Sequence, residues 1–234
     1  KIQKQGLTLE KMWDKTEENI SIPATDMEHY AEHPDVIFVC VKGYSLQETI
    51  PFIKRIARKN TIVIPVLNIY GTGGKMQKEL PDLLVTDGCI YVSANIKEPG
   101  KLLQHGQILH IVFGVRDKAE FRPELKEIQK DLCDSHIDGT LSENIRREAL
   151  EKFSYVSPIG AAGLYYHATA ADFQKEGEAR ELFKTMIKEI AALAEAMGVP
   201  FQKDMAEVNL KILSNLAPEA TTSMQRDIMA GKQS

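Results

Sequence analysis

Two short apolar runs, DVIFVCVK (35–42) and TIVIPVLN (61–68), constrain the fold of this chain most strongly. Their length and their many β-branched residues are typical of parallel strands that are buried on both faces. Between them, apolar residues recur every three or four positions from Leu46 to Ile56, which predicts an amphipathic helix. The segment therefore predicts a βαβ unit with a right-handed crossover, in which Cys40 is a buried and inert thiol.

The following residues predict an extension of this sheet and then a change to helices. Two further apolar segments indicate antiparallel strands that extend the sheet. They are GCIYVSANI and QILHIVFGV, and they flank the connection KEPGKLLQHG. RPELKEIQKDLCDS indicates a helix, and HIDGTLSEN a short strand or loop. From Ser142, the expected N-cap of the next helix, every pattern is helical. We expect an α/β domain over residues 1–141 and an all-helical domain over residues 142–234.

Composition narrows the function to small-molecule chemistry. The 234 residues carry 29 basic and 33 acidic side chains, a net charge of -4, which gives no basic surface for nucleic acid or anionic membranes. Three cysteines without a CxxC pair indicate neither disulfides nor a zinc ribbon, so we expect a reducing cytoplasm. The longest stretch without a charge, residues 153–171, contains Pro158 and two glycines, and we reject a membrane helix there.

Polar side chains stand where the two predicted parallel strands end. Lys42 ends the first run and Asn68 ends the second. Ligands bind at the carboxyl edge of open α/β sheets, where an ammonium suits phosphate or carboxylate and an amide suits a nicotinamide, ribose or hydroxyl group. Either residue alone could equally mark the start of a loop, whereas the pair is more specific.

Two other patterns favour structural explanations. Gly71, Gly73 and Gly74 precede a helix and could present free amides to an anion, but a plain strand-to-helix turn explains them better. His29 and His33 have a spacing that suits a metal, yet no third ligand is placed by spacing, so we predict no metal site.

Lys152 stands at the head of the charge-free stretch 153–171. On a helix it shares an apolar stripe with Val156 and Ile159, so it must extend to solvent, pair, or face a cleft. A desolvated lysine has a lowered pKa and can donate a proton near neutrality. Pro158 removes one backbone donor and should kink the helix or expose a carbonyl group near the cleft, although adaptation to the core explains it equally well.

Five segments, in this order, resemble the ketopantoate reductase (2-dehydropantoate 2-reductase) family, and the resemblance covers essentially the whole chain. They are VIFVCVKGYS, VLNIYGTGG, ALEKFSYVSPIGAAG, AALAEAMGV and SMQRDIMAGKQS. The resemblance implies a Rossmann-type α/β domain, lacking its first βα unit in this chain, followed by an all-α domain of the 6-phosphogluconate dehydrogenase C-terminal type. It implies NADPH-dependent reduction of ketopantoate to pantoate, in pantothenate biosynthesis.

The resemblance also assigns roles to residues. Lys152 matches the lysine that protonates the developing alkoxide, and Asn68 the asparagine that contacts cofactor and substrate. Lys42 matches a lysine near the cofactor. Ser223 matches a serine that helps to hold the substrate carboxylate, although it could be only a helix cap. A small 2-keto acid is the implied partner, and a homodimer stays open.

Departures from the family leave the substrate and the cofactor open. The glycine-rich GxGxxG segment that would precede Lys1, and a glutamate that would follow Ser234, lie outside this sequence, so we expect the natural chain to extend beyond both ends. Val156, Gly160 and Ala170 stand where the family usually has asparagine. The alternatives are a related hydroxyacid dehydrogenase with another small 2-keto acid, or a catalytically silent nucleotide-binding module.

Overall fold

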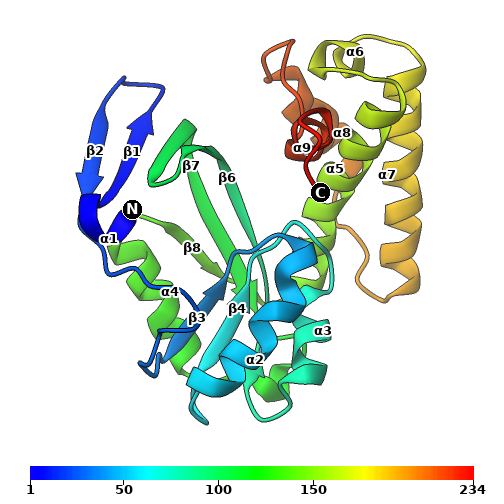
Figure 1. The fold of residues 1–234 in the computed structure, drawn as a ribbon. Coiled ribbons are helices and arrows are strands. Elements are labelled where there is room, and N and C mark those ends of the chain that lie inside the picture. Colours follow the sequence, from blue (N-terminus) through cyan, green and yellow to red (C-terminus); the bar gives the residue numbers. More distant parts are fainter.

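The computed structural model describes residues 1–234, with sheets in the first part of the chain and helices in the last (Figure 1). This confirms the predicted α/β part followed by a helical part. The elements in chain order are α1 (Ile2–Gln5), β1 (Leu7–Lys11), β2 (Glu17–Ile20), β3 (Val36–Val39), α2 (Leu46–Ile56), β4 (Ile62–Pro65), α3 (Thr72–Glu79), β5 (Leu84–Val85), β6 (Asp87–Glu98), β7 (Lys101–Gly114), α4 (Glu124–Asp134), β8 (Asp138–Leu141), α5 (Ile145–Tyr165), α6 (Ala170–Gln174), α7 (Glu178–Ala196), α8 (Met205–Ser214) and α9 (Ser223–Met229).

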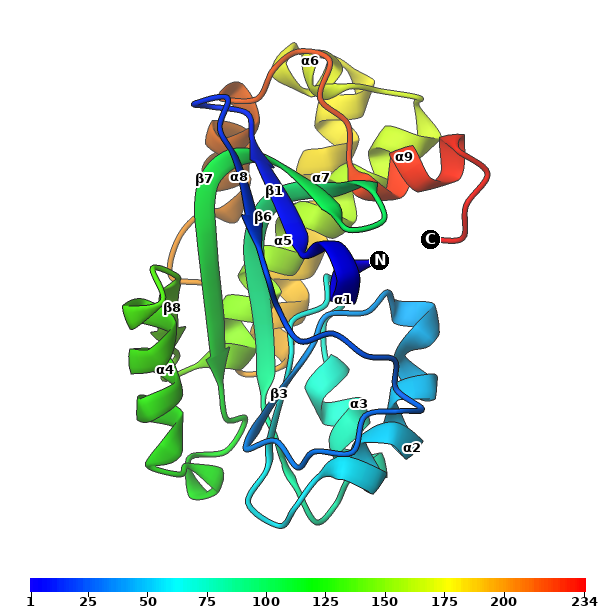
Figure 2. The same ribbon diagram turned by 60° about the vertical axis from the view of Figure 1, so that its left-hand side comes forward.

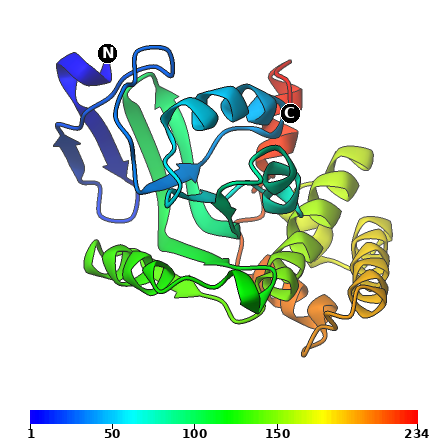
Figure 3. The same cartoon turned by 90° about the horizontal axis from the view of Figure 1, so that it is seen from below.

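A three-stranded parallel sheet in the order β3-β4-β5 contains the predicted βαβ unit. Its central strand β4 is buried along its whole length, because Val63 packs with α2 and α3 while Ile62 and Ile64 pack with β7 and α4. Figure 3 shows α4 on the opposite side of the sheets from α2 and α3.

The prediction that the first run is buried on both faces is wrong for β3. Phe38 is 38% exposed, and Cys40, just after the strand, is exposed rather than buried. The reason is position in the sheet, since β3 is an edge strand with a neighbour on one side only.

The antiparallel strands β6 and β7 are confirmed, but they belong to a second sheet, in the order β2-β1-β7-β6 with β8 paired to β7. They therefore do not extend the parallel sheet. The predicted connection was also too long, because the turn is only Pro99–Gly100 and residues 101–106 continue β7. These residues stay extended because β1 pairs with them in parallel, from Thr8 opposite Lys101 onward.

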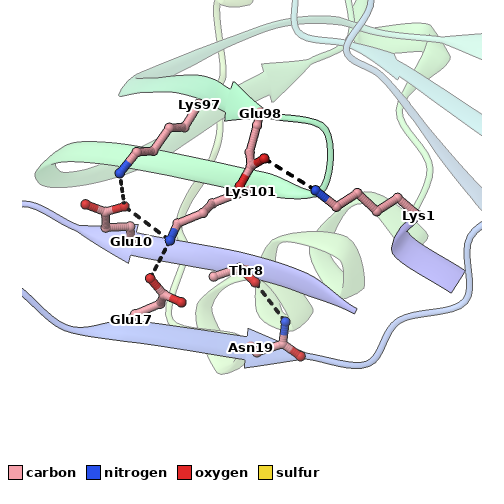
Figure 4. A network of polar contacts seen from close by, with 8 residues as sticks. All are labelled: Lys1, Thr8, Glu10, Glu17, Asn19, Lys97, Glu98 and Lys101. Carbon is pink, nitrogen blue, oxygen red and sulfur yellow. Dashed lines mark hydrogen bonds and ion pairs between the residues drawn. The ribbon is translucent and has the colours of Figure 1, made fainter. Parts of the chain in front are cut away.

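The start of the chain adds β1 and β2 to the far end of the β6–β7 hairpin (Figure 2). Side-chain pairs accompany the backbone ladder (Figure 4). Lys97 contacts Glu10 at 2.7 Å, and Lys101 contacts Glu17 at 2.5 Å. β2 is exposed at every position, so it has no apolar alternation by which the sequence could have indicated it.

The helical part has its own core, in which α5 packs against α7 and α8, and α6 packs on the same two helices. Ile159 of α5, Phe173 of α6 and Phe183 of α7 are among its buried side chains. The start of α5 packs instead on the sheet, where Ile145 contacts Cys89 and Val112. Because α5 belongs to both packing units, the domain boundary at residue 141 stays a prediction. No helix is both long enough and apolar enough to cross a membrane.

The cap of α5 differs from the prediction. Asn144, not Ser142, is the N-cap, and its side chain accepts from the Arg147 amide. The Ser142 hydroxyl instead donates to Glu148 and accepts from the Asn144 amide, so it stabilises the turn that precedes the helix.

Candidate active site between the sheets and the helices

A cleft of about 760 Å³ lies between the sheet-forming part and the helices. Its walls come from the residues that follow β3 and β4, from β6, from α5, and from α9 with the loop before it. Both predicted strand-end residues, Lys42 and Asn68, line it, and so does Ser223. The parallel strands place their carboxyl ends at this edge, which explains why residues distant in sequence meet here.

Lys152 is brought directly to Asn68. Its Nζ donates to Asn68 Oδ1 at 2.7 Å and also to the Ile90 carbonyl. Although it is a lysine, it is only 9% exposed and forms no ion pair. Its side chain lines a small cavity of about 20 Å³ that shares Asn68 and Val156 with the large cleft. Of the three arrangements open to it, Lys152 therefore takes the one that pairs it with an amide and a carbonyl, beside the large cleft rather than in its wall.

Burial decides the electrostatics of Lys152. Desolvation lowers its pKa below that of an ordinary lysine, and the neighbouring Cys89 opposes this shift. The face of the Tyr91 ring lies beneath the ammonium, 4.9 Å from Nζ to the ring centroid. Sequence reasoning missed both Ile90 and Tyr91, because an apolar strand carries no pattern that indicates a lysine above it.

The helix that presents Lys152 contains Pro158, and the predicted exposed carbonyl does not occur. Proline removes the amide that would donate to Ser154 O, four residues earlier. Asn209 of α8, only 1% exposed, donates to that carbonyl at 3.1 Å and to Ser154 Oγ at 3.1 Å. The vacancy in the helix ladder is thus filled from a neighbouring helix and does not face the cleft.

Lys42 follows β3, and its side chain extends to the last helix, α9. Its Nζ contacts Asp227 Oδ2 of α9 at 2.5 Å, with the lysine side chain 53% exposed. It is the only charged side chain in the wall of the cleft. The ion pair joins the sheet-forming part to the last helix, and no sequence spacing indicates it because 185 positions separate the partners.

Ser223 is the first residue of α9 and faces the cleft, while the preceding Thr222 is the N-cap. Ser223 is therefore not the cap of this helix. Gln225 anchors the helix, since it is buried and donates to the Ala168 carbonyl at 2.7 Å. Gly163 of α5 permits this close approach, because a Cβ there would lie 2.8 Å from the Gln225 side chain.

The three positions where the family usually has asparagine are not equivalent. Val156 and Ala170 line the cleft, so their apolar side chains form part of its wall. Gly160 does not; a Cβ there would lie 2.7 Å from the Met224 methyl group, so this position serves the packing of α9 on α5. Two of the three positions, Val156 and Ala170, therefore give the cleft an apolar surface.

The glycine-rich turn holds an anion of the protein itself. The backbone of Gly73 and Gly74 at the start of α3 lowers the pKa of the Asp87 carboxyl group, and Arg116 lies 3.7 Å from that carboxylate. Burial nevertheless raises the pKa of Asp87, and Arg116 opposes that shift. A Cβ on Gly73 would meet the Thr86 carbonyl at 2.0 Å, so glycine is required by close packing.

The histidines show no metal geometry. His29 contacts Asp26 at 2.6 Å, and His33 contacts the Ile56 carbonyl at 2.7 Å. The structure brings together no group of three or more His, Cys, Asp or Glu side chains.

The donor set of the cleft fits a nicotinamide cofactor. Val41, Val66 and Ile90 supply apolar walls, Asn68 supplies an amide that both donates and accepts, and Lys42 supplies a cation at the edge. The volume of about 760 Å³ suits a cofactor fragment together with a small substrate.

Comparison with known proteins gives the same assignment over most of the chain. The family model described as ketopantoate reductase PanE/ApbA matches residues 1–118, and the model for its C-terminal part matches residues 144–234. The 2-dehydropantoate 2-reductase of Aquifex aeolicus is 22% identical over 212 residues, which cover 89% of this chain and 68% of that protein. The chain spans about two thirds of the length of the curated relatives it matches.

Solved structures share the fold at low identity. A dimeric ketopantoate reductase from Staphylococcus aureus has a TM-score of 0.81 at 21% identity, covering 97% of this chain and 74% of that one. A D-mandelate dehydrogenase in a ternary structure with NADH and anilino(oxo)acetate has a TM-score of 0.84 at 18% identity, covering 100% and 75%. At these identities the likeness establishes the fold alone.

Proposed function

Because the chain belongs to the ketopantoate reductase PanE/ApbA family, we propose that it reduces a small 2-keto acid to the 2-hydroxy acid, with ketopantoate as substrate and NADPH as reductant. The observation that carries the proposal is the buried ammonium of Lys152, 2.7 Å from Asn68 beside the cleft. Bound NADPH supplies the hydride. The product would be pantoate, which places the reaction in pantothenate biosynthesis.

Lys152 donates the proton that completes the reduction. As the carbonyl carbon gains a hydride, its oxygen develops negative charge, and the ammonium transfers a proton to it and becomes a neutral amine. Desolvation supports this role, because a lowered pKa makes the proton easier to give. Fixed donors aimed at the developing alkoxide require no reorganisation during the reaction.

The other cleft residues bind and orient. Asn68 fixes Lys152 through Oδ1 and offers its amide to cofactor and substrate. Ser223, exposed at the opposite wall, donates to the substrate carboxylate, and Lys42 attracts the anionic cofactor. The S. aureus relative is described as dimeric, so a homodimer is the assembly to look for in solution.

A second candidate is the reduction of a 2-keto acid whose side chain carries no hydroxyl group. Val156 and Ala170 favour it, because they line the cleft and offer no hydrogen bond to the hydroxyl of ketopantoate. A D-mandelate dehydrogenase that shares this fold is named for a different 2-hydroxy acid, which supports this candidate. A catalytically silent module is disfavoured by the contact between Lys152 and Asn68.

Steady-state assays separate these functions. With NADPH saturating, ketopantoate should turn over faster than pyruvate, 2-ketoisovalerate and phenylglyoxylate, and NADPH should serve better than NADH. A preference for the apolar acids would replace the first candidate with the second. No turnover of any 2-keto acid with either cofactor would favour the silent module.

Lys152→Ala tests the proton donor. We expect kcat to fall by about 10²- to 10⁴-fold, because a positioned general acid contributes that much, while NADPH binding stays near normal. Lys188→Ala, an exposed lysine of α7 away from the cleft, is the matched control and should leave kcat unchanged. Activity of Lys152→Ala close to that of the parent would refute the role.

A further inference from the structure

We propose that Tyr91 is a positioning residue that holds the Lys152 ammonium against Asn68 with the face of its ring. This inference rests on the proposed function only where it predicts activity. The ring centroid lies 4.9 Å from Nζ, within the distance at which an aromatic face attracts a cation. The carbonyl of the adjacent Ile90 accepts from the same ammonium, so two consecutive residues of β6 hold it.

The ring itself is fixed from behind. Tyr91 stacks on His110 of β7, with centroids 5.4 Å apart and planes inclined by 23°. His110 Nε2 lies 3.1 Å from Thr140 Oγ1 of β8. Three paired strands therefore set the height and tilt of the ring, and the ring sets where the ammonium can rest.

The surroundings make the ring important. Lys152 forms no ion pair, and its two hydrogen-bond acceptors are both neutral oxygens. The titratable groups facing this region are Cys89 and Tyr91 of β6, His110 of β7, and Glu148 and Glu151 of α5. The aromatic face thus adds to the negative potential of the two neutral oxygens that hold the desolvated ammonium.

The ring acts without ionising. Burial raises the pKa of the Tyr91 hydroxyl far above neutrality, and Cys89 raises it further, so the side chain stays neutral. The attraction comes from the ring quadrupole, which phenylalanine also has. A role for the hydroxyl as a proton relay would instead require tyrosine, and this difference allows the two to be separated.

The test compares Tyr91→Phe with Tyr91→Leu by two readouts. The first is the pH dependence of Lys152 acylation by trace acetic anhydride in the holoenzyme, followed by mass spectrometry, which reports the pKa of the amine. The second is the pH profile of kcat. Loss of the ring destabilises the charged form, so the pKa of Lys152 in Tyr91→Leu should drop by about 0.5 to 1.5 units.

Each outcome decides the question. Because reduction needs the protonated amine, the alkaline limb of kcat should move to lower pH in Tyr91→Leu and stay in place in Tyr91→Phe. A shifted acylation pKa without a shifted kcat limb supports positioning by Tyr91 and refutes Lys152 as the acid. An unchanged acylation pKa in Tyr91→Leu overturns the proposal. An equal drop of the Lys152 pKa in Tyr91→Leu and Tyr91→Phe also overturns it. If Tyr91→Leu does not fold, Tyr91→Met carries the same comparison.

Discussion

At the scale of single residues, Pro158 and Asn209 form a compensating pair. Proline interrupts the hydrogen-bond ladder of the helix that carries Lys152, and a buried amide from α8 replaces the missing donor. An unsatisfied buried carbonyl costs free energy, so a helix with an interior proline needs such a partner. The hydrogen bonds of Asn209 also tie α8 to α5 at Ser154, two residues after Lys152.

Asn209→Leu should lower the free energy of unfolding by about 1–3 kcal/mol, because it leaves Ser154 O without a donor. Pro158→Ala restores an amide at that place, so the same substitution in a Pro158→Ala background should cost less. Urea unfolding of the four proteins measures the coupling. Asn60→Leu, at an exposed position in the turn before β4, is the control. Equal costs in both backgrounds would show that Asn209 does not compensate for the proline.

At the scale of elements, the position of α9 depends on glycines of α5. Gly160 and Gly163 both face α9, and a side chain at either would meet it closely. The neighbours differ in freedom, because the Met224 methyl group is the end of a flexible chain while Gln225 is buried and hydrogen-bonded. Since α9 carries Ser223 and Asp227, the distance between these two helices sets the width of the cleft.

Gly163→Ala should therefore destabilise the protein by about 1–3 kcal/mol and raise KM for the keto acid, because overpacking pushes α9 outward. Gly160→Ala should change stability by less than about 1 kcal/mol, since Met224 can move and alanine favours the helix. Thermal unfolding and steady-state kinetics measure both. If the two variants behave alike, the difference between the flexible and the fixed neighbour is not what limits the approach.

At the scale of the whole molecule, an ion pair joins the sheet-forming part to the last helix beside the cleft. Lys42 extends from the sheet and Asp227 from the last helix. The pair is partly exposed, so its contribution to stability is small. Its effect on binding should be larger than its effect on folding, because under the proposed role of Lys42 the Asp227 carboxylate would compete with an anionic cofactor for the same ammonium.

Asp227→Asn should tighten NADPH binding by about two- to fivefold, which corresponds to the energy of an exposed ion pair. Lys42→Ala should weaken binding, and adding Asp227→Asn to it should have no further effect, because the competition has then been removed. Fluorescence titration measures the affinities for NADPH. The free energy of unfolding, measured with urea, should change by less than about 1 kcal/mol in each variant. Weaker binding in Asp227→Asn alone would mean that Asp227 helps to hold the cofactor.

Much of the fold follows from local patterns of apolar residues. The predictions that were wrong, and the strands that were missed, concern features that such patterns do not record. The buried run of β4 and the amphipathic α2 were predictable because their periodicity reflects burial directly. The exposure of Cys40 was not, because edge and central strands share the same composition. The strands β1 and β2 were missed because they are held by pairing with β7 and by charged side chains rather than by an apolar face.

The amino-acid sequence by itself determined which chemical groups this protein has available and the elements that carry them. It placed Lys42 and Asn68 at strand ends and Lys152 at the head of an apolar stretch. Only the tertiary structure decided that Lys152 meets Asn68, that Tyr91 lies beneath it, and that Asp227 pairs with Lys42. The physical reason is that local periodicity records whether a face is buried, whereas the partner of a buried polar group is chosen by packing between distant segments.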